Sequence, residues 1–231
     1  MTAPRLEFGE VFGGYGGGIV VHDVSAEVAA GEALCVVGRN GVGKSTLLKL
    51  LFGFLPLASG YVRFDGVDVT GLRPAERSRL GIGFCPQERV VFDDLSVLDN
   101  LTLMASSRRL DHLETCFARF PRLAERLSQT AGTLSGGERK ILSFVRAFAE
   151  NKPLVMLDEP TEGVQSENIG HMSELINQRK ASGTAFVIVE QNLDFVAEVV
   201  DSYLVLDQGR TMLARRRDEV ERAEIVEFLT V

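Results

Sequence analysis

The run GRNGVGKST at residues 38–46 fits the pattern G-x-x-x-x-G-K-[ST], whose backbone N–H groups cradle phosphate oxygens. An apolar, strand-like run precedes it at 33–37. A helix-like run follows at 45–53, so that the helix dipole points at the bound anion. The pattern predicts binding of a nucleoside triphosphate, and an ordinary glycine turn is the alternative. Three glycines supply the backbone angles that such a loop needs: Gly38, Gly41 and Gly43.

Two side chains of this run have chemical roles in the pattern. Lys44 reaches the terminal phosphates, and the hydroxyl of Ser45 holds Mg²⁺. The rest of the run contacts the nucleotide mainly through its backbone. The nucleotide-binding residues expected here are Gly38, Asn40, Gly41, Gly43, Lys44, Ser45 and Thr46.

The composition is that of an ordinary globular chain. Of the 231 residues, 45% are hydrophobic and 25% are charged, which suits one large domain with a substantial core. The net charge of −7 offers no basic surface for nucleic acid. No apolar run reaches the length of a membrane span and no leader pattern opens the sequence, so we expect a cytoplasmic protein. Three widely spaced cysteines argue against disulfides or zinc and predict buried free thiols: Cys35, Cys85 and Cys116.

Alternating strand-like and helix-like segments predict an α/β fold with a mostly parallel, open sheet. The connections between them are short, and the apolar runs have the length of strands. The expected strands of this sheet are 33–37, 81–85, 154–158, 185–189 and 203–207. The expected helices are 45–53, 138–150, 167–180, 193–200 and one near 216–228.

Two further parts are expected within a single domain spanning 1–231. Residues 5–11 and 19–28 alternate in polarity on either side of a glycine-rich connection, and a third alternating stretch, 60–69, carries a turn at Asp65–Gly66. These stretches predict an N-terminal antiparallel β subdomain. Later in the chain, 97–128 reads as mostly helical, and we expect an inserted helical subdomain at about 88–150.

A second element of the site follows an apolar strand. The run LVMLDEP at 154–160 ends this strand in Asp158 and Glu159, and open α/β sheets bind ligands at the carboxyl ends of their strands. We expect Asp158 to hold Mg²⁺ and Glu159 to act as the general base for a water that attacks the γ-phosphate. An acidic pair alone also fits a solvated turn. Together with the loop at 38–46, it predicts hydrolysis of the nucleotide.

The run TLSGGERK at 133–140 leads into an amphipathic helix whose apolar positions recur at i, i+3, i+4 and i+7 from Ile141. Ser135, Gly136 and Gly137 therefore lie at the N-terminus of that helix, a geometry that binds anions. By itself the run also fits an ordinary serine N-cap. Two such helix N-termini in one chain suggest a nucleotide that is shared between two subunits.

The order of these motifs resembles the ATP-binding subunits of ATP-binding-cassette (ABC) transporters. The motifs in this order are the loop at 38–46, Pro86–Gln87, LSGGE at 134–138 and LDEP at 157–160. The resemblance covers essentially the whole chain. The resemblance implies an ATPase that uses ATP and Mg²⁺ and works as a head-to-tail dimer. Each ATP is then held between the phosphate loop of one protomer and Ser135–Gly136–Gly137 of the other.

The resemblance also assigns roles to residues outside the loop. Tyr15 matches the aromatic residue that stacks on adenine, and a loop anchor is the alternative. Gln87 matches the glutamine that contacts Mg²⁺ or water and couples the site to the membrane partner, and a simple turn residue is the alternative. Gln191 stands where the family usually has a histidine, and it can donate a hydrogen bond to the γ-phosphate without carrying a proton. There are two other departures from the family pattern. Gln165 stands in place of an aspartate that bridges the dimer, and Glu138 stands in place of the usual glutamine. Both bear on the rate of hydrolysis more than on the binding of ATP.

These departures narrow the resemblance to one branch of the family. VEQN at 189–192 and EPTEGVQ at 159–165 are similar to one ATPase subunit of importers of the branched-chain amino acid type, including their urea and short-chain amide branch. In that branch a glutamine at 191 is normal. The resemblance implies a second ATPase subunit or a homodimer, two transmembrane permease subunits and an external solute-binding protein. The chain then lies on the inner face of the cell membrane, and its partners select the solute.

A soluble cassette protein of a cytosolic assembly complex is the principal alternative. DNA-repair relatives carry long coiled-coil insertions and translation relatives carry two cassettes, and neither feature appears in these 231 residues. A cluster-assembly cassette is similar in size, although the VEQN run favours the importer branch. A catalytically silent nucleotide sensor requires the loss of Lys44 or Glu159, and both are present.

Overall fold

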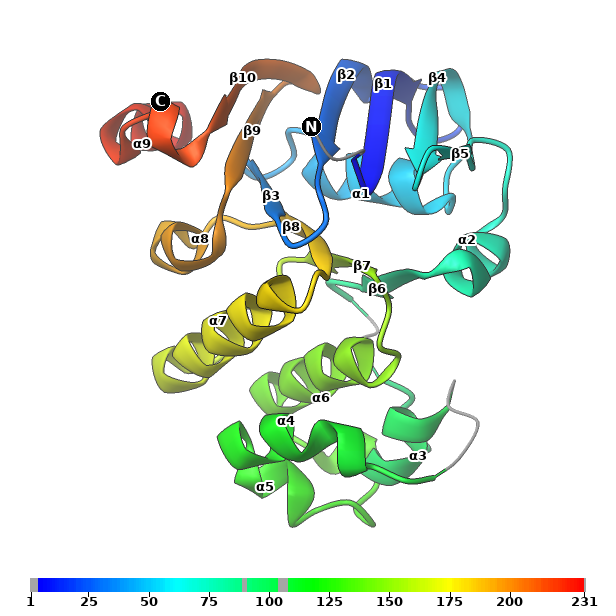
Figure 1. Cartoon of the computed structure of the whole chain (residues 1–231), viewed down its shortest axis with the longest axis vertical. Coiled ribbons are helices and arrows are strands. Elements are labelled where there is room, and N and C mark those ends of the chain that lie inside the picture. Colours follow the sequence, from blue (N-terminus) through cyan, green and yellow to red (C-terminus); the bar gives the residue numbers. More distant parts are fainter. Residues whose placement is uncertain (1–3, 89–90, 104–107, 231) are drawn as a thin grey trace.

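The computed structural model describes residues 4–88, 91–103 and 108–230, which form two β-sheets and a set of helices (Figure 1). The strands of the larger sheet are β3 (Ala33–Val37), β6 (Ile82–Cys85), β7 (Leu154–Asp158), β8 (Ala185–Val189), β9 (Ser202–Asp207) and β10 (Arg210–Arg216). They lie in the order β10-β9-β3-β8-β7-β6. All neighbours pair in parallel except β10, which runs antiparallel to β9. The predicted α/β fold with a mostly parallel sheet is confirmed.

The smaller sheet is antiparallel and comes from the N-terminal part of the chain. Its strands are β1 (Leu6–Gly13), β2 (Val21–Val28), β4 (Leu57–Phe64) and β5 (Val67–Asp68), in the order β2-β1-β4-β5. Asp65 and Gly66 join β4 to β5 with φ angles of 47° and 75°, which are the left-handed angles of a tight hairpin turn. The sequence therefore predicts this sheet and its turn correctly.

Helix α1 (Lys44–Phe52) lies between the two sheets and packs against both. Leu34 and Val36 of β3 face this helix, whereas Cys35 and Val37 face the other side, because side chains alternate along a strand. Both faces of the sheet are thus buried at its central strands, which explains why these strands are apolar. The helices that cover the second face are α6 (Gly136–Ala149), α7 (Ser166–Ala181) and α8 (Leu193–Val199).

The segment between β6 and β7 holds several short helices, which lie at the lower end of Figure 1. They are α3 (Val97–Thr102), α4 (Glu114–Arg119) and α5 (Pro121–Ala124), followed by α6. The segment 97–128 is thus helical in part, but Pro121 starts a new helix, and among its described residues no long helix forms before α6. Residues 89–90 and 104–107 of the expected helical subdomain lie outside the described residues.

The C-terminal region differs from the sequence prediction. A helix is predicted near 216–228, whereas the structure has strand β10 up to Arg216 and helix α9 (Arg222–Thr230) only afterwards. Gln208 and Gly209 have φ angles of 45° and 74°, so the chain reverses tightly and pairs with β9. The prediction is wrong for the start of the helix because this reversal places the following residues on the edge of the sheet.

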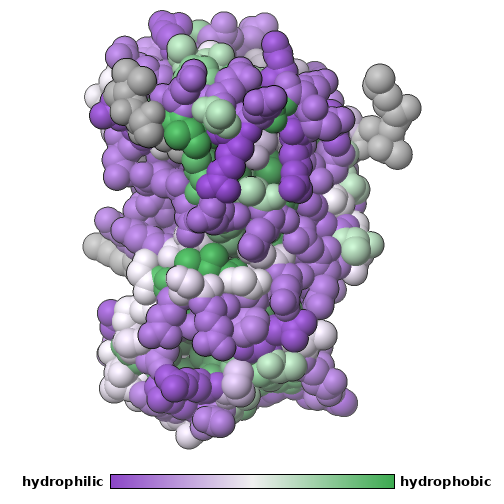
Figure 2. Space-filling view, turned by 90° about the vertical axis from the view of Figure 1, so that its left-hand side faces the viewer, coloured by the Kyte–Doolittle hydropathy of each residue, from purple (hydrophilic) through white to green (hydrophobic). Residues whose placement is uncertain are grey.

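The face of the molecule drawn in Figure 2 is mostly polar. Figure 2 shows hydrophilic side chains over most of one face, with apolar side chains in small separate groups. Among the described residues, none of the helices combines the length and the apolar character needed to cross a membrane. The three cysteines are buried free thiols, as predicted: Cys35, Cys85 and Cys116.

Helix α2 (Pro74–Leu80) brings a buried cation to the far end of α1. The side chain of Arg77 is 1% exposed, and its guanidinium donates hydrogen bonds to the carbonyls of Leu50 and Leu51 at the end of α1. It also donates to the carbonyls of Thr70 and Leu72. A cation at a helix C-terminus also interacts favourably with the helix dipole. Arg77 therefore fixes the end of α1 opposite to the phosphate loop.

Replacing Arg77 by methionine should lower the free energy of unfolding by about 3 kcal/mol, because buried carbonyls lose their donors. Urea denaturation followed by circular dichroism measures this change. Arg79, exposed on the same helix, provides the control, and Arg79→Met should shift stability by no more than about 0.5 kcal/mol. Equal midpoints for the two variants would contradict the structural role of Arg77.

Candidate active site

The predicted phosphate-binding loop connects β3 to α1, and its geometry requires its glycines. Gly43 has a φ of 107° just before the helix. A Cβ atom on Gly38 would lie 2.4 Å from the carbonyl oxygen of Leu206 in β9, so no larger residue fits there without displacing backbone. Thr46, in the first turn of α1, is buried. The loop is therefore held against the sheet with the N-terminus of α1 behind it.

The side chain of Lys44 lies within this loop and is 4% exposed. Its Nζ donates hydrogen bonds to the carbonyls of Gly38 and Arg39 at 2.8 and 2.9 Å, and it lies 3.9 Å from Oε1 of Glu159. Burial lowers the pKa of Lys44, while the carboxylates of Glu159 and Asp158 act in the opposite direction. A positive charge is thus placed at the centre of the loop, beside the acidic end of β7.

Ser45 and Asp158 join the phosphate loop to β7. The hydroxyl of Ser45 donates to Oδ1 of Asp158 at 2.8 Å, and Asp158 is 2% exposed. Burial raises the pKa of Asp158. The hydrogen bond from Ser45 opposes this rise and the nearby carboxylate of Glu159 adds to it. A bound cation would stabilise this buried carboxylate in its charged form.

These two residues fit a magnesium ion that is shared with a phosphate ligand. Within the described ranges, no group of three or more His, Cys, Asp or Glu side chains is placed to hold a metal by itself. Mg²⁺ is usually held by one or two carboxylates together with substrate phosphates and waters. The hydroxyl of Ser45 and the carboxylate of Asp158, next to the phosphate loop, supply such a partial set.

Glu159 follows β7 directly and points its carboxylate toward the loop. Its Oε1 accepts a hydrogen bond from Nε2 of Gln191 at 2.9 Å, and its Oε2 accepts one from Nε2 of Gln87 at 2.8 Å. Gln191 also donates to Oδ1 of Asn40 in the loop at 2.6 Å. The two amides fix the direction of the carboxylate and leave lone pairs free for a water molecule. The structure therefore brings together four of the predicted polar residues: Asn40, Gln87, Glu159 and Gln191.

Tyr15 lies apart from this cluster. Its ring is 50% exposed, and its hydroxyl accepts a hydrogen bond from Nζ of Lys49 on α1 at 3.2 Å. The Lys49 ammonium lies 5.8 Å from the ring centroid. The ring is thus tethered to the helix of the phosphate loop while its faces stay accessible. Its role in stacking on adenine remains a prediction.

The second glycine run forms the N-terminus of α6. Ser135 is the N-cap: its Oγ accepts from the N–H of Glu138, whose carboxylate accepts from the N–H of Ser135, and this is a capping box. A Cβ atom on Gly137 would lie 2.9 Å from the carbonyl oxygen of Gly163, so the loop after β7 approaches closely here. In the described part of the chain, no hydrogen bond or ion pair joins Ser135, Gly136 or Gly137 to the phosphate loop.

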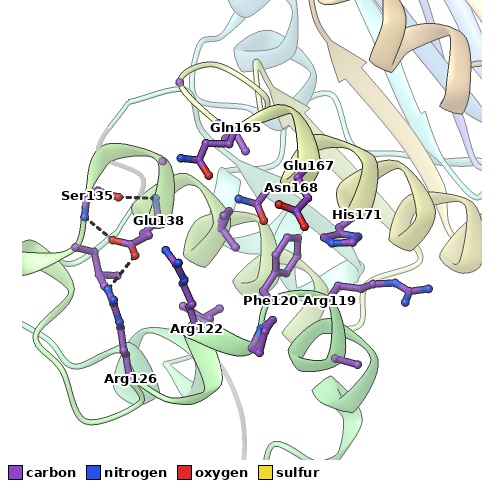
Figure 3. A pocket seen from close by; sticks show the side chains of 18 residues that line it. Arg119, Phe120, Arg122, Arg126, Ser135, Glu138, Gln165, Glu167, Asn168 and His171 are labelled. Carbon is purple, nitrogen blue, oxygen red and sulfur yellow. Dashed lines mark hydrogen bonds and ion pairs between the residues drawn. The ribbon is translucent and has the colours of Figure 1, made fainter.

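A groove of about 640 Å³ opens beside this N-terminus, between α4 and α5 on one side and α6 and α7 on the other (Figure 3). Two of its cations are already paired, Arg126 with Glu138 and Arg119 with Glu174. Ser135 and Gln165 lie along its edge, so this groove borders the second glycine run and lies apart from the phosphate loop.

Comparison with known proteins agrees with this geometry. The family model described as ABC transporter matches residues 21–162, which include the phosphate loop, the run at 134–138 and the acidic strand. The chain belongs to the ABC transporter family. It is accordingly an ATP-binding ATPase, as the order of its motifs predicts.

Several relatives match this ABC ATPase over almost its whole length. The branched-chain amino acid transport ATP-binding protein BraG of Pseudomonas aeruginosa is 37% identical over 90% of this chain and 91% of its own. A probable branched-chain amino acid transport ATP-binding protein, LivF of Archaeoglobus fulgidus, is 34% identical over 91% of each chain. The lipopolysaccharide export ATP-binding protein LptB of Escherichia coli is 32% identical over 92% of this chain and 90% of its own. The predicted resemblance to ATPases of the branched-chain amino acid type is thus confirmed.

Solved structures show the same fold. One is the crystal structure of a nucleotide-free ATP-binding cassette from an ABC transporter. Its sequence is 26% identical to this chain, and its TM-score is 0.82 over 97% of this chain and 96% of that one. The ADP conformation of another ATP-binding cassette, also 26% identical, has a TM-score of 0.80 over 98% of both chains.

Sequence reasoning misses three charged residues around this ABC ATPase site. Glu190 is 3% exposed, and its carboxylate accepts hydrogen bonds from the N–H groups of Thr161 and Gln191, so it fixes the two turns that carry the acid and the amide. The sequence feature that could have identified Glu190 is its position as a carboxylate residue directly after an apolar strand. The other two, Lys140 and Glu162, are brought to the site by tertiary packing.

Proposed function

We propose that this ABC ATPase drives an importer of a small polar solute, a branched-chain amino acid or a urea or amide compound. The 37% identity with BraG over 90% of the chain carries this proposal. ATP binding stabilises a closed state, and hydrolysis removes the γ-phosphate contacts that favour it.

The arrangement of the site supports a role for each residue. Lys44 binds the terminal phosphates, with its ammonium already held at the centre of the loop. Glu159 takes the proton of the attacking water, and Gln87 and Gln191 hold its carboxylate in place. Mg²⁺, when held by Ser45 and Asp158, would neutralise phosphate charge.

The separation of the two glycine runs supports a dimer as the working form. Ser135, Gly136 and Gly137 make no bond to the phosphate loop within the part of the chain described, and Ser135 borders an open groove. We propose that this edge contacts ATP bound to a second cassette, either a different ATPase subunit or an identical copy. The N–H groups of α6 and its dipole would then face the γ-phosphate.

The proposed partners are two transmembrane permease subunits, supplied by an external solute-binding protein. The chain itself is proposed to lie in the cytoplasm, on the inner face of the membrane. Affinity purification from detergent-solubilised native membranes should recover two hydrophobic permeases together with the tagged chain. A complex without any membrane subunit would overturn the importer proposal and favour the alternative of a soluble assembly ATPase.

A transport assay separates import from export, the direction named for LptB. Deletion of the gene should lower uptake of radiolabelled leucine, and the parent chain should restore it. The Glu159→Gln variant should not restore uptake, since hydrolysis is lost. Unchanged leucine uptake in the deletion strain calls for the same test with urea and acetamide, and unchanged uptake of all three would contradict the proposal.

A further inference from the structure

Lys140 is a cation on the buried side of α6. It lies four residues before Phe144, which is fully buried, and its own side chain is only 9% exposed. Residues four apart share one face of a helix. A charged group in such a place needs compensating partners, because burial of an unpaired charge is unfavourable.

The partners of Lys140 belong to the turn that carries the proposed general base. Its Nζ donates a hydrogen bond to the backbone carbonyl of Glu159 at 3.1 Å and lies 3.8 Å from Oε2 of Glu162. Nε2 of Gln87 lies 3.3 Å from the same oxygen of Glu162 and 2.8 Å from Oε2 of Glu159. Lys140 on α6 and Gln87 in the loop after β6 thus hold the turn between Glu159 and Glu162 from two sides.

The backbone of Glu159 needs such support. Its φ of 46° lies in the left-handed region, which is unfavourable for a residue with a side chain. Its N–H donates to the carbonyl of Val189 in β8 at 2.9 Å, and its own carbonyl accepts from Lys140. The residue is thus held on one side by the sheet and on the other by α6.

We propose that Lys140 is a positioning residue that keeps Glu159 in this backbone conformation and so aims its carboxylate at the phosphate loop. The proposal rests on the proposed role of Glu159 as general base. It links α6, the helix capped by Ser135, directly to the hydrolytic carboxylate of the same chain. Movement of α6 would therefore change the direction of Glu159 without changing the phosphate loop.

The test compares Lys140→Met with Arg139→Met. Methionine keeps the apolar stem of Lys140 and removes its donor and its charge. Arg139 directly precedes Lys140 on α6, and its guanidinium donates a hydrogen bond to the carbonyl of Gly132 instead of to the turn that carries Glu159. In the nucleotide-free protein, hydrogen exchange of the segment 158–162 should be about tenfold faster in Lys140→Met and unchanged in Arg139→Met.

Kinetics give the second readout. Lys140→Met should lower kcat by about 10- to 100-fold while the KM for ATP stays within about threefold, since the phosphate loop is intact. Lys140→Arg keeps a charged donor and should retain most of kcat. If Lys140 had a purely structural role, its replacement would lower thermal stability without lowering kcat selectively while KM stays unchanged.

Glu162→Gln tests the same link at an exposed position, because the Glu162 side chain is 60% exposed and its replacement does not endanger folding. It should lower kcat about two- to fivefold, and its effect should not add to that of Lys140→Met. Unchanged exchange at 158–162 in Lys140→Met, or, if that variant does not fold, an unchanged kcat in Glu162→Gln, overturns the inference. A parent chain without ATPase activity in its complex would instead refute the role of Glu159, and the exchange experiment would still decide the positioning role.

Discussion

Glu159→Gln is expected to lower ATP turnover by about 10²- to 10⁴-fold while ATP still binds, because the amide cannot take a proton from the attacking water. The proposed contacts to the phosphates come from Lys44, Ser45 and the loop, and the substitution leaves these residues and their bonds in place. Glutamine has nearly the shape of glutamate, so the unfolding free energy should change by no more than about 1 kcal/mol.

The same variant should accumulate as an ATP-bound dimer, since the closed state forms but is no longer released by hydrolysis. Size-exclusion chromatography with light scattering, in the presence of Mg²⁺ and ATP, measures the mass. A Gly136→Glu change in the Glu159→Gln background should abolish the dimer, because it places a negative charge at the edge proposed to meet the γ-phosphate of the second cassette's ATP. A Cβ atom on Gly136 meets no atom within 4 Å, so this change does not disturb the fold.

Gly71→Glu in the same background is the matched control. Gly71 also has open space around a Cβ position and lies before α2, away from the second glycine run. This variant should dimerise like Glu159→Gln alone. Turnover of Glu159→Gln close to that of the parent would remove Glu159 from its proposed role. Dimers that persist in the Gly136→Glu variant would remove the run at 134–138 from the interface.

The larger sheet and its phosphate loop follow from local sequence. The strands at 33–37, 154–158 and 185–189 are predicted with the bounds that the structure gives, because each is a short apolar run whose ends are marked by polar, glycine or proline residues. The loop at 38–46 is predicted because its glycines and its lysine have fixed spacing. In both cases the information lies within about ten consecutive residues.

The edges of the fold are less predictable. Strand β10 is exposed over most of its length and carries basic residues, so it lacks the apolar pattern that identifies the inner strands. It forms because the reversal at Gln208–Gly209 brings it against β9. Helix α9 is displaced toward the C-terminus for the same reason.

The predicted site residues are recognisable one by one, but their mutual contacts are not. Glu159 and Gln191 are 32 positions apart, and their hydrogen bond exists only because β7 and β8 are neighbours in the sheet. Lys140 illustrates the same limit: its place four residues before Phe144 indicates burial, but only the packing of α6 shows that it reaches the carbonyl of Glu159. The motifs therefore predict the chemistry, and tertiary structure determines how the reacting groups are held.

Lys44→Ala is expected to weaken ATP binding or hydrolysis by about 100-fold or more, because a charge-assisted contact to the β- and γ-phosphates is lost. The structure adds a second reason. The ammonium of Lys44 bonds to the carbonyls of Gly38 and Arg39, so its removal also leaves the loop without an internal support. The factor of 100 corresponds to about 2.7 kcal/mol of binding or transition-state free energy.

Fluorescence titration with an ATP analogue and a steady-state ATPase assay separate the two effects of this substitution. Lys152→Ala is the control, because Lys152 also bonds to a backbone carbonyl, that of Ser78, but lies before β7 at the opposite end of the strand from Asp158. This control should keep both affinity and turnover. If Lys44→Ala behaved like Lys152→Ala in both assays, the loop at 38–46 would not be the phosphate site. A loss confined to turnover would instead show that Lys44 acts mainly on the charge that develops during phosphoryl transfer.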